Sequence, residues 1–288
     1  MDRRTFLTMS AATALLRPGT TAAAGRLPIK KAVEFEMLPN KISILDRLQM
    51  ARDAGFEQIE CPTMEDEHEA EETKKAAEKT GLRIHSVMNM AHWDYPLSSP
   101  DPAVVAKSMA GMKTSLRNAH FWGADTVLLV PAVVTPDTSY RDAWTRSVKQ
   151  IRELIPMAEE LKVIIGIEEV WNKFLLSPLE MARYVDDFKS PWIRSYFDVG
   201  NVVFYGYPQD WIRTLGKRII KLHIKDFRYK DDKTEWTDLR DGSIDWKEVH
   251  KALGEIGYQG SATVELHEGG AAYLKEVNRR FELILQGA

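Results

Sequence analysis

The chain has 288 residues, of which 44% are hydrophobic and 28% charged, and its formal net charge is −3. This length fits one large α/β domain or two ordinary domains, and the composition excludes intrinsic disorder and a collagen-like fibre. No basic excess indicates nucleic acid, and no run of about 18 uncharged apolar residues is present to span a membrane. Cys61 is the only cysteine, which excludes an intramolecular disulfide and a cysteine-based zinc or iron–sulfur site.

The first 24 residues are expected to form an export signal. Residues 3–7 read RRTFL, an apolar stretch follows as far as Leu16, and three alanines at 22–24 suit a cleavage site. Paired arginines followed by x-Phe-Leu resemble the twin-arginine signal, which exports proteins that have already folded. An ordinary secretory signal is the alternative. We expect the twin-arginine machinery to export the folded protein, and residues 25–288 to act in the periplasm or outside the cell.

One pattern repeats after residue 25: an amphipathic stretch ends at a glycine, and an apolar run follows at once. Glycine just past a helix takes the left-handed conformation that ends it. Helix starts are marked by a capping side chain followed by proline, as in Asp101-Pro102 and Ser177-Pro178. The glycines in question are Gly55, Gly81, Gly123 and Gly257.

The apolar runs predict eight strands, and a helix-like segment follows each of them. Eight alternations of strand and helix are typical of a (β/α)₈ TIM barrel. A doubly wound sheet is the alternative, but no Gly-x-Gly-x-x-Gly turn follows the first strand. No linker divides the chain, so we predict a single-domain α/β barrel over residues 25–288. The predicted strands lie near residues 32–37, 57–61, 82–88, 125–131, 163–168, 193–198, 218–224 and 261–266.

Polar residues end four successive strands of this predicted barrel: Glu168, Asp198, His223 and Glu265. Barrel active sites lie at the C-terminal ends of the strands. Buried carboxylates are costly unless they are paired or metal-bound, and three carboxylates with one imidazole suit a divalent ion such as Mn²⁺. A helix cap or an ion pair is the alternative for each residue alone. The four together predict a metal site.

These strand ends resemble those of the xylose-isomerase-like TIM barrels, also called the sugar phosphate isomerase/epimerase superfamily. The resemblance covers roughly residues 30–286, and it implies one divalent ion held by Glu168, Asp198, His223 and Glu265. Mn²⁺ is favoured, with Mg²⁺, Co²⁺ and Zn²⁺ as alternatives. Glu169 is the alternative ligand on the fifth strand, because only one of two adjacent residues faces the barrel axis. The motifs are Ile-Glu of strand five, Phe-Asp-Val-Gly-Asn of strand six, Leu-His-Ile-Lys-Asp of strand seven and Val-Glu-Leu of strand eight.

The resemblance implies a metal-dependent isomerase or epimerase of a sugar or polyol ketone. The metal polarises a chelated carbonyl, one carboxylate removes the neighbouring proton to give an enediolate, and a second carboxylate returns a proton. Glu168 and Glu265 are expected in these two catalytic roles. Export favours an unphosphorylated substrate, because phosphorylated sugars are mostly cytoplasmic.

Three other functions remain as alternatives. The first is a metal-dependent lyase or hydratase that acts on a keto-sugar or a 3-keto-glycoside through the same enolisation. The others are a non-catalytic sugar-binding barrel and a DNA-repair enzyme, the last disfavoured by the export signal and the acidic chain. We expect no nucleic-acid or membrane partner, and a homo-oligomer is left open.

Five further residues are expected to contact substrate or support the site: Glu60, His85, His92, Asn201 and Lys225. A buried, hydrogen-bonded structural role is the alternative for Glu60 and the two histidines. Lys225 is placed to stabilise a developing oxyanion, with a surface salt bridge as the alternative. Many relatives have His where this chain has Asn201, which argues against a three-metal cluster like that of endonuclease IV. The charged stretch from Arg228 to Asp245 is expected to be a lid or a solvated loop.

Overall fold

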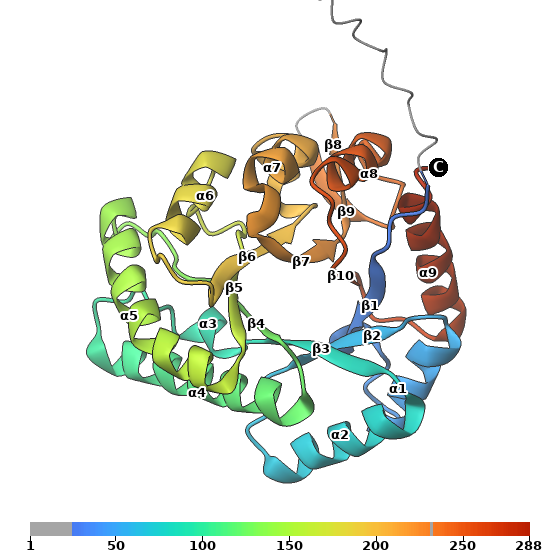
Figure 1. The fold of residues 1–288 in the computed structure, drawn as a ribbon, viewed down its shortest axis with the longest axis horizontal. Helices are drawn as coiled ribbons and strands as arrows, with labels where there is room; N and C mark the ends of the chain where they lie inside the picture. The colour runs from blue at the N-terminus through green and yellow to red at the C-terminus, as the bar shows by residue number, and fades with distance from the viewer. Residues whose placement is uncertain (1–24, 231–232) are drawn as a thin grey trace, which may run out of the picture.

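The computed structural model describes residues 25–230 and 233–288, and the expected export signal at residues 1–24 lies outside them. Eight parallel strands close into a barrel, and the helices surround it (Figure 1), which confirms the predicted TIM barrel. Around the barrel the order is β1-β10-β7-β6-β5-β4-β3-β2. The barrel strands are β1 (Lys30–Glu34), β2 (Gln58–Pro62), β3 (Arg83–Met88), β4 (Thr126–Leu129), β5 (Ile164–Ile167), β6 (Ile193–Asp198), β7 (Ile219–Ile224) and β10 (Ser261–Val264).

The helices begin and end close to the positions marked in the sequence. Ser177 caps α6 by accepting a hydrogen bond from the Glu180 amide, and Gly81 and Gly123 end α2 and α4 in the left-handed conformation. In the described part of the chain no helix has the length and apolarity that crossing a bilayer requires. The helices are α1 (Ile44–Asp53), α2 (Glu67–Thr80), α3 (Ala91–Asp94), α4 (Pro102–Trp122), α5 (Tyr140–Leu161), α6 (Pro178–Asp186), α7 (Pro208–Leu215), α8 (Trp246–Glu255) and α9 (Ala271–Leu285).

Alternation along the strands separates the apolar layer from a polar barrel interior. On β7, Leu222 and Ile224 belong to the hydrophobic core between strands and helices. Lys221 and His223 alternate with them and point to the other side, as the period of two in a strand requires. The barrel therefore carries polar groups along its axis, and the last of them lie at its C-terminal mouth.

A hairpin follows β7 and stands at this mouth. It consists of β8 (Asp226–Lys230) and β9 (Lys233–Thr237), which pair in antiparallel fashion. The buried Asp226 carboxylate anchors its base by accepting hydrogen bonds from the Arg240 amide at 2.8 Å and from Trp246 Nε1 at 2.9 Å. The first part of the stretch that we expected to be a lid or a loop is thus regular structure attached to the barrel rim.

Candidate metal centre

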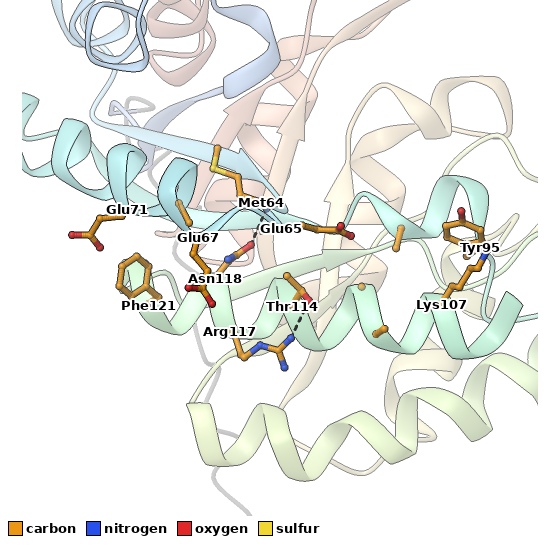
Figure 2. Close-up of a pocket in the computed structure, with 14 residues that line it drawn as sticks. Met64, Glu65, Glu67, Glu71, Tyr95, Lys107, Thr114, Arg117, Asn118 and Phe121 are labelled. Carbon is orange, nitrogen blue, oxygen red and sulfur yellow. Dashed lines mark hydrogen bonds between the residues drawn. The ribbon is translucent and has the colours of Figure 1, made fainter. Parts of the chain in front are cut away.

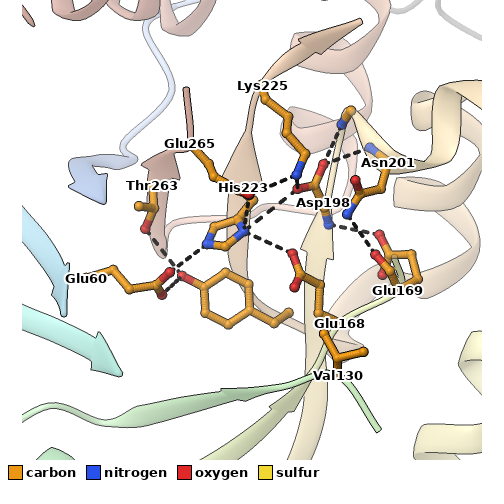
Figure 3. A network of polar contacts seen from close by, with 12 residues as sticks. Glu60, Val130, Glu168, Glu169, Asp198, Asn201, His223, Lys225, Thr263 and Glu265 are labelled. Carbon is orange, nitrogen blue, oxygen red and sulfur yellow. Dashed lines mark hydrogen bonds and ion pairs between the residues drawn. The ribbon is translucent and has the colours of Figure 1, made fainter. Parts of the chain in front are cut away.

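Four side chains from four adjacent strand ends meet at the barrel mouth (Figure 3). Glu168, Asp198, His223 and Glu265 each offer one ligand atom, and these atoms lie within 4.8 Å of one another. His223 Nδ1 lies 2.9 Å from both Glu168 Oε1 and Glu265 Oε2, and 3.7 Å from Asp198 Oδ2. The structure therefore brings together the four residues that the sequence analysis expects to bind a metal.

Strand register explains this convergence. Asp198 pairs with His223 between β6 and β7, and His223 pairs with Thr263 between β7 and β10. Glu168 directly follows β5, and Glu265 is the second residue after Thr263. Because parallel strands end at the same edge of the sheet, residues that are far apart in sequence reach one level of the barrel.

Glu60 on β2 contacts Nε2 of the His223 imidazole, the ring nitrogen that lies away from the other three clustered residues. Its Oε1 atom lies 2.7 Å from His223 Nε2, and its Oε2 atom accepts hydrogen bonds of 2.5 Å from Ser86 and from Tyr196. A carboxylate on one ring nitrogen fixes the orientation of the ring and leaves the other nitrogen to face a metal. The structure gives Glu60 this supporting contact across the barrel.

Asp198 and Glu169 are positioned by backbone and side-chain contacts on the β6 side. Asp198 Oδ1 accepts hydrogen bonds from the amides of Gly200 and Asn201 at 2.7 and 2.8 Å. Glu169 turns away from the cluster and accepts from the Asp198 amide at 2.9 Å. Asn201 Nδ2 donates to the Glu169 carbonyl. Geometry thus selects Glu168, not Glu169, as the member of the cluster, and Asn201 contacts protein atoms there.

Lys225 supplies the positive charge within the cluster. Its Nζ atom lies 2.9 Å from Asp198 Oδ2 and 2.9 Å from Glu265 Oε2. Burial lowers the pKa of Lys225, but Asp198 and Glu265 raise it more, so its net shift is upward and the group is an ammonium. The cluster holds three carboxyl groups for this one ammonium, and a divalent cation suits such an excess of acidic groups.

The local environment shifts the pKa values of the two carboxyl groups expected to transfer protons, Glu168 and Glu265, in opposite directions. Burial raises the pKa of Glu168 to about 7, although His223 opposes this shift. Burial also acts to raise the pKa of Glu265, but Lys225 and His223 lower it below its ordinary value. One carboxyl is therefore held more basic than the other at the same centre.

An open cavity of about 870 Å³ adjoins the cluster at Glu265 and Lys225, and its volume is within the range of small-molecule sites. Lys225 and Glu265 form part of its wall, and Trp236 of β9, which is 49% exposed, forms another part. Trp236 stacks on Trp171 with ring centroids 5.0 Å apart. Trp236 and Glu34 also line the cavity, and neither was among the residues expected to contact the substrate. The lining residues are Glu34, Glu36, Lys225, Trp236, Thr237, Asp238, Glu265, Leu266, His267 and Glu268.

The two expected substrate histidines do not line this cavity. His85 is fully buried in the barrel, where its Nε2 lies 2.9 Å from the Thr263 hydroxyl. His92 on α3 is buried as well, and its Nδ1 accepts a hydrogen bond from the Val130 amide. Burial lowers the pKa of His92 to about 3. Both contacts are those of a buried, hydrogen-bonded histidine with a structural role, the alternative stated for these residues.

A second cavity of about 860 Å³ lies outside the barrel between α2 and α4 (Figure 2). Acidic residues such as Glu65 and Glu71 share its wall with Lys107, Arg117 and apolar side chains. None of the four clustered residues reaches it. The chemistry of the site is therefore assigned to the barrel mouth.

The fold and this centre are those of a known family. The chain belongs to the xylose isomerase-like TIM barrel family, whose model matches residues 48–282. L-ribulose-5-phosphate 3-epimerase UlaE of Escherichia coli O1:K1 is 24% identical over 233 residues, which cover 77% of this chain and 81% of UlaE.

Solved structures agree with this assignment at the level of the fold. D-allulose 3-epimerase from Methylomonas sp., solved with D-allulose, is 20% identical with a TM-score of 0.70, and the match covers 89% of this chain and 90% of that one. 3-Keto-D-glucoside 4-epimerase YcjR from E. coli is 13% identical with a TM-score of 0.74, covering 87% and 98%. These relatives are sugar epimerases, in line with the expected class of enzyme.

Proposed function

We propose that the protein is a divalent-metal-dependent epimerase or isomerase of an unphosphorylated keto-sugar or polyol ketone. The observation that carries the proposal is the cluster of Glu168, Asp198, His223 and Glu265, in which the ligand atoms lie within 4.8 Å of one another and Glu265 also lines an open cavity. Membership of a family whose relatives include several sugar 3-epimerases supports the same class of reaction.

The donor set fits a divalent cation. Asp198 Oδ2 is buried and makes no hydrogen bond of good geometry among the described residues, although Lys225 Nζ lies 2.9 Å away. Carboxylate oxygens with one imidazole nitrogen suit Mn²⁺, which we favour over Mg²⁺, Co²⁺ and Zn²⁺. When bound, such an ion supplies Lewis-acid polarisation of a substrate carbonyl.

The proton chemistry is assigned to two carboxylates. Glu168 and Glu265 come from strands on the two sides of β6 and β7 and approach His223 Nδ1 from these two sides, and Glu265 also lines the cavity. One removes the proton from the carbon next to the carbonyl, and the other returns a proton. The Lys225 ammonium faces the same space and stabilises negative charge that develops on the substrate oxygen.

Cavity charge favours a substrate without a phosphate group. Five carboxylate side chains line the cavity, and Lys225, the only lysine or arginine among the described residues that line it, already contacts Asp198 and Glu265. Phosphate sites in proteins rely on arginine, lysine or helix N-termini. UlaE is named for a phosphorylated pentulose, so we propose that this chain differs from it in substrate.

A lyase or hydratase acting on a 3-keto-glycoside is the second candidate. The cavity is near the upper end of the size range for small-molecule sites, and its Trp236 wall is suited to stack against a second ring. YcjR, which shares the fold, is named for a 3-keto-D-glucoside. One of the same two carboxylates would then remove the proton, and the other carboxyl group would give a proton to the oxygen of the departing group as its bond to carbon breaks.

Turnover in D₂O tests the proposal. Mn²⁺-loaded protein is mixed with a panel of keto-sugars and 3-keto-glycosides, and products are analysed by NMR. An epimerase places solvent deuterium on the carbon next to the carbonyl and keeps the carbon skeleton, whereas a lyase releases an aglycone or water and leaves an unsaturated ketone. Glu168→Gln and Glu265→Gln are each expected to slow exchange by at least about 100-fold. Full exchange in both variants would refute the two-carboxylate mechanism.

We also propose export by the twin-arginine route. Its basis is the sequence at residues 3–7, which lies outside the described residues. Loading the metal in the cytoplasm before export would protect a Mn²⁺ site from Cu²⁺ and Zn²⁺, which bind most sites more tightly. Cells that carry Arg3→Lys with Arg4→Lys are expected to lose the protein from the periplasmic fraction. An undiminished periplasmic level would exclude this route.

A further inference from the structure

Glu34 at the end of β1 is a buried carboxyl group without a protein partner. Only 9% of the residue is exposed. Within the described chain its carboxylate has no hydrogen-bond or ion-pair partner, whereas Glu60, Glu168, Asp198 and Glu265 each have at least one. Polar groups with little exposure usually have a hydrogen-bond partner, and Glu34 has an open cavity beside it from which a partner can come. The Glu34 carboxyl group is therefore available to a ligand in that cavity.

The position of Glu34 places its carboxyl group beside the metal cluster. It is paired in register with Glu60 on β2, and its neighbour Val33 is paired with Val264 on β10, directly before Glu265. Glu34 lines both the large cavity that adjoins the metal centre and a narrower space that Glu60 and Met88 also line. Its carboxyl thus faces the substrate space beside the cluster, on the side away from Asp198 and Glu168.

We infer that Glu34 forms a hydrogen bond with a hydroxyl group of the sugar, on a carbon outside the reacting pair, and thereby determines which sugars bind. The inference rests on the proposed function for the class of ligand, but it concerns binding and needs no turnover. The Glu34 carboxylate is able to accept hydrogen bonds from sugar hydroxyl groups through both of its oxygen atoms. A polyhydroxylated ligand supplies the partner that the protein itself lacks.

Sugar binding to three proteins tests the inference: the wild type, Glu34→Ala and Glu34→Gln. Each full-length protein is loaded with Mn²⁺, and its affinity for D-tagatose and D-allulose, and for the monodeoxy derivatives of the tighter-binding sugar, is measured by calorimetry. Glu34→Ala is expected to weaken binding of the parent sugar by about 10-fold or more, the usual effect of losing a hydrogen bond to a charged group. Glu34→Gln, which still accepts through its amide oxygen, is expected to recover most of this loss.

The deciding result is whether the loss of affinity caused by Glu34→Ala depends on the presence of one particular hydroxyl group of the sugar. In the wild type, one deoxy position should weaken binding by about the same factor as Glu34→Ala, and in Glu34→Ala that position should have no further effect. Glu160→Ala, which removes an exposed carboxylate from α5 outside the barrel, serves as the control for a lost charge. Metal content is measured in every sample.

Other outcomes overturn the inference. Equal losses for every deoxy sugar in wild type and Glu34→Ala would exclude a specific hydroxyl contact, and loss of Mn²⁺ from Glu34→Ala would mean that the residue acts through the metal ligands. If neither D-tagatose nor D-allulose binds to the wild-type protein, the inference is also overturned. Binding with the expected coupling but without deuterium exchange would leave Glu34 as a sugar contact and would refute the proposed reaction alone.

Discussion

The contact between Glu60 and His223 decides how well the imidazole can serve a metal. Glu60 is fully buried and is held in turn by Ser86 and Tyr196. We expect Glu60→Gln to weaken Mn²⁺ affinity about 10- to 100-fold, the usual effect of losing such a supporting carboxylate, while the barrel stays folded. Calorimetric titration with Mn²⁺ measures the change. Ser86→Ala, which removes only one donor to Glu60, should have a smaller effect, and unchanged affinity in Glu60→Gln would contradict this role.

His92 makes the stability of the protein depend on pH. Burial holds its pKa at about 3 in the folded state, against about 6.5 for an unperturbed histidine. Below about pH 6.5 the unfolded chain takes up a proton that the folded protein does not, so the free energy of unfolding decreases as the pH falls towards 3. The contribution of His92 has a slope of at most about 1.4 kcal/mol per pH unit.

Urea unfolding at pH 4, 5, 6 and 7 measures this slope. His92→Gln is expected to show a weaker decrease between pH 6 and pH 4 than the wild type, because the variant lacks the titrating ring. His68→Gln, which replaces an exposed histidine on α2, should keep the wild-type slope. Identical slopes in wild type and His92→Gln would show that the ring is protonated in the folded protein.

At the scale of elements, the hairpin of β8 and β9 depends on its aromatic contacts with the barrel rim. Trp236 stacks on Trp171 and lies 5.0 Å from Lys225 Nζ, and within the hairpin it contacts its cross-strand partner Phe227 at a centroid distance of 5.0 Å. Aromatic pairs contribute about 0.5–1.5 kcal/mol each beyond buried area. Trp236→Ala should therefore loosen the hairpin and raise the KM for the substrate.

Limited trypsin digestion tests this expectation. Arg228 and Lys230 lie on β8 and are cleavage sites. Cleavage there should be faster in Trp236→Ala than in the wild type, whereas Tyr207→Ala, which removes an aromatic side chain that is 73% exposed, should leave the rate unchanged. Equal rates in Trp236→Ala and the wild type would mean that strand pairing alone holds the hairpin.

For the whole molecule, a metal ion that joins four strands should stabilise the closed barrel. A ligand that binds only the folded state adds about 2.7 kcal/mol when its concentration is 100 times its Kd. For a protein of this size that corresponds to a rise in Tm of roughly 5–10 °C. We expect Mn²⁺ to raise the Tm by this amount over the EDTA-treated protein. His223→Ala should respond much less, and an equal response would place the stabilising metal elsewhere.

Local patterns in the sequence were sufficient to predict the barrel and the four clustered residues. Apolar runs and glycine helix ends depend on neighbours a few residues apart, and each predicted strand lies within a few residues of the observed one. Parallel strands end at one edge, so polar residues at successive strand ends had to converge. The expectation that these four residues form one cluster followed from this rule together with the family motifs.

Closure of the barrel decided the contacts between distant residues. Glu60 and His223 are 163 residues apart, and only the closed ring of strands brings the two side chains together. Strand alternation allowed either Glu168 or Glu169 to face the axis, and the hydrogen bond from the Asp198 amide selects the direction of Glu169. The lack of a partner for Glu34 is likewise a property of three-dimensional packing. The sequence by itself determined which residues reach the barrel mouth, whereas the tertiary structure decided which of them satisfy one another, because hydrogen bonds depend on distances that no local periodicity specifies.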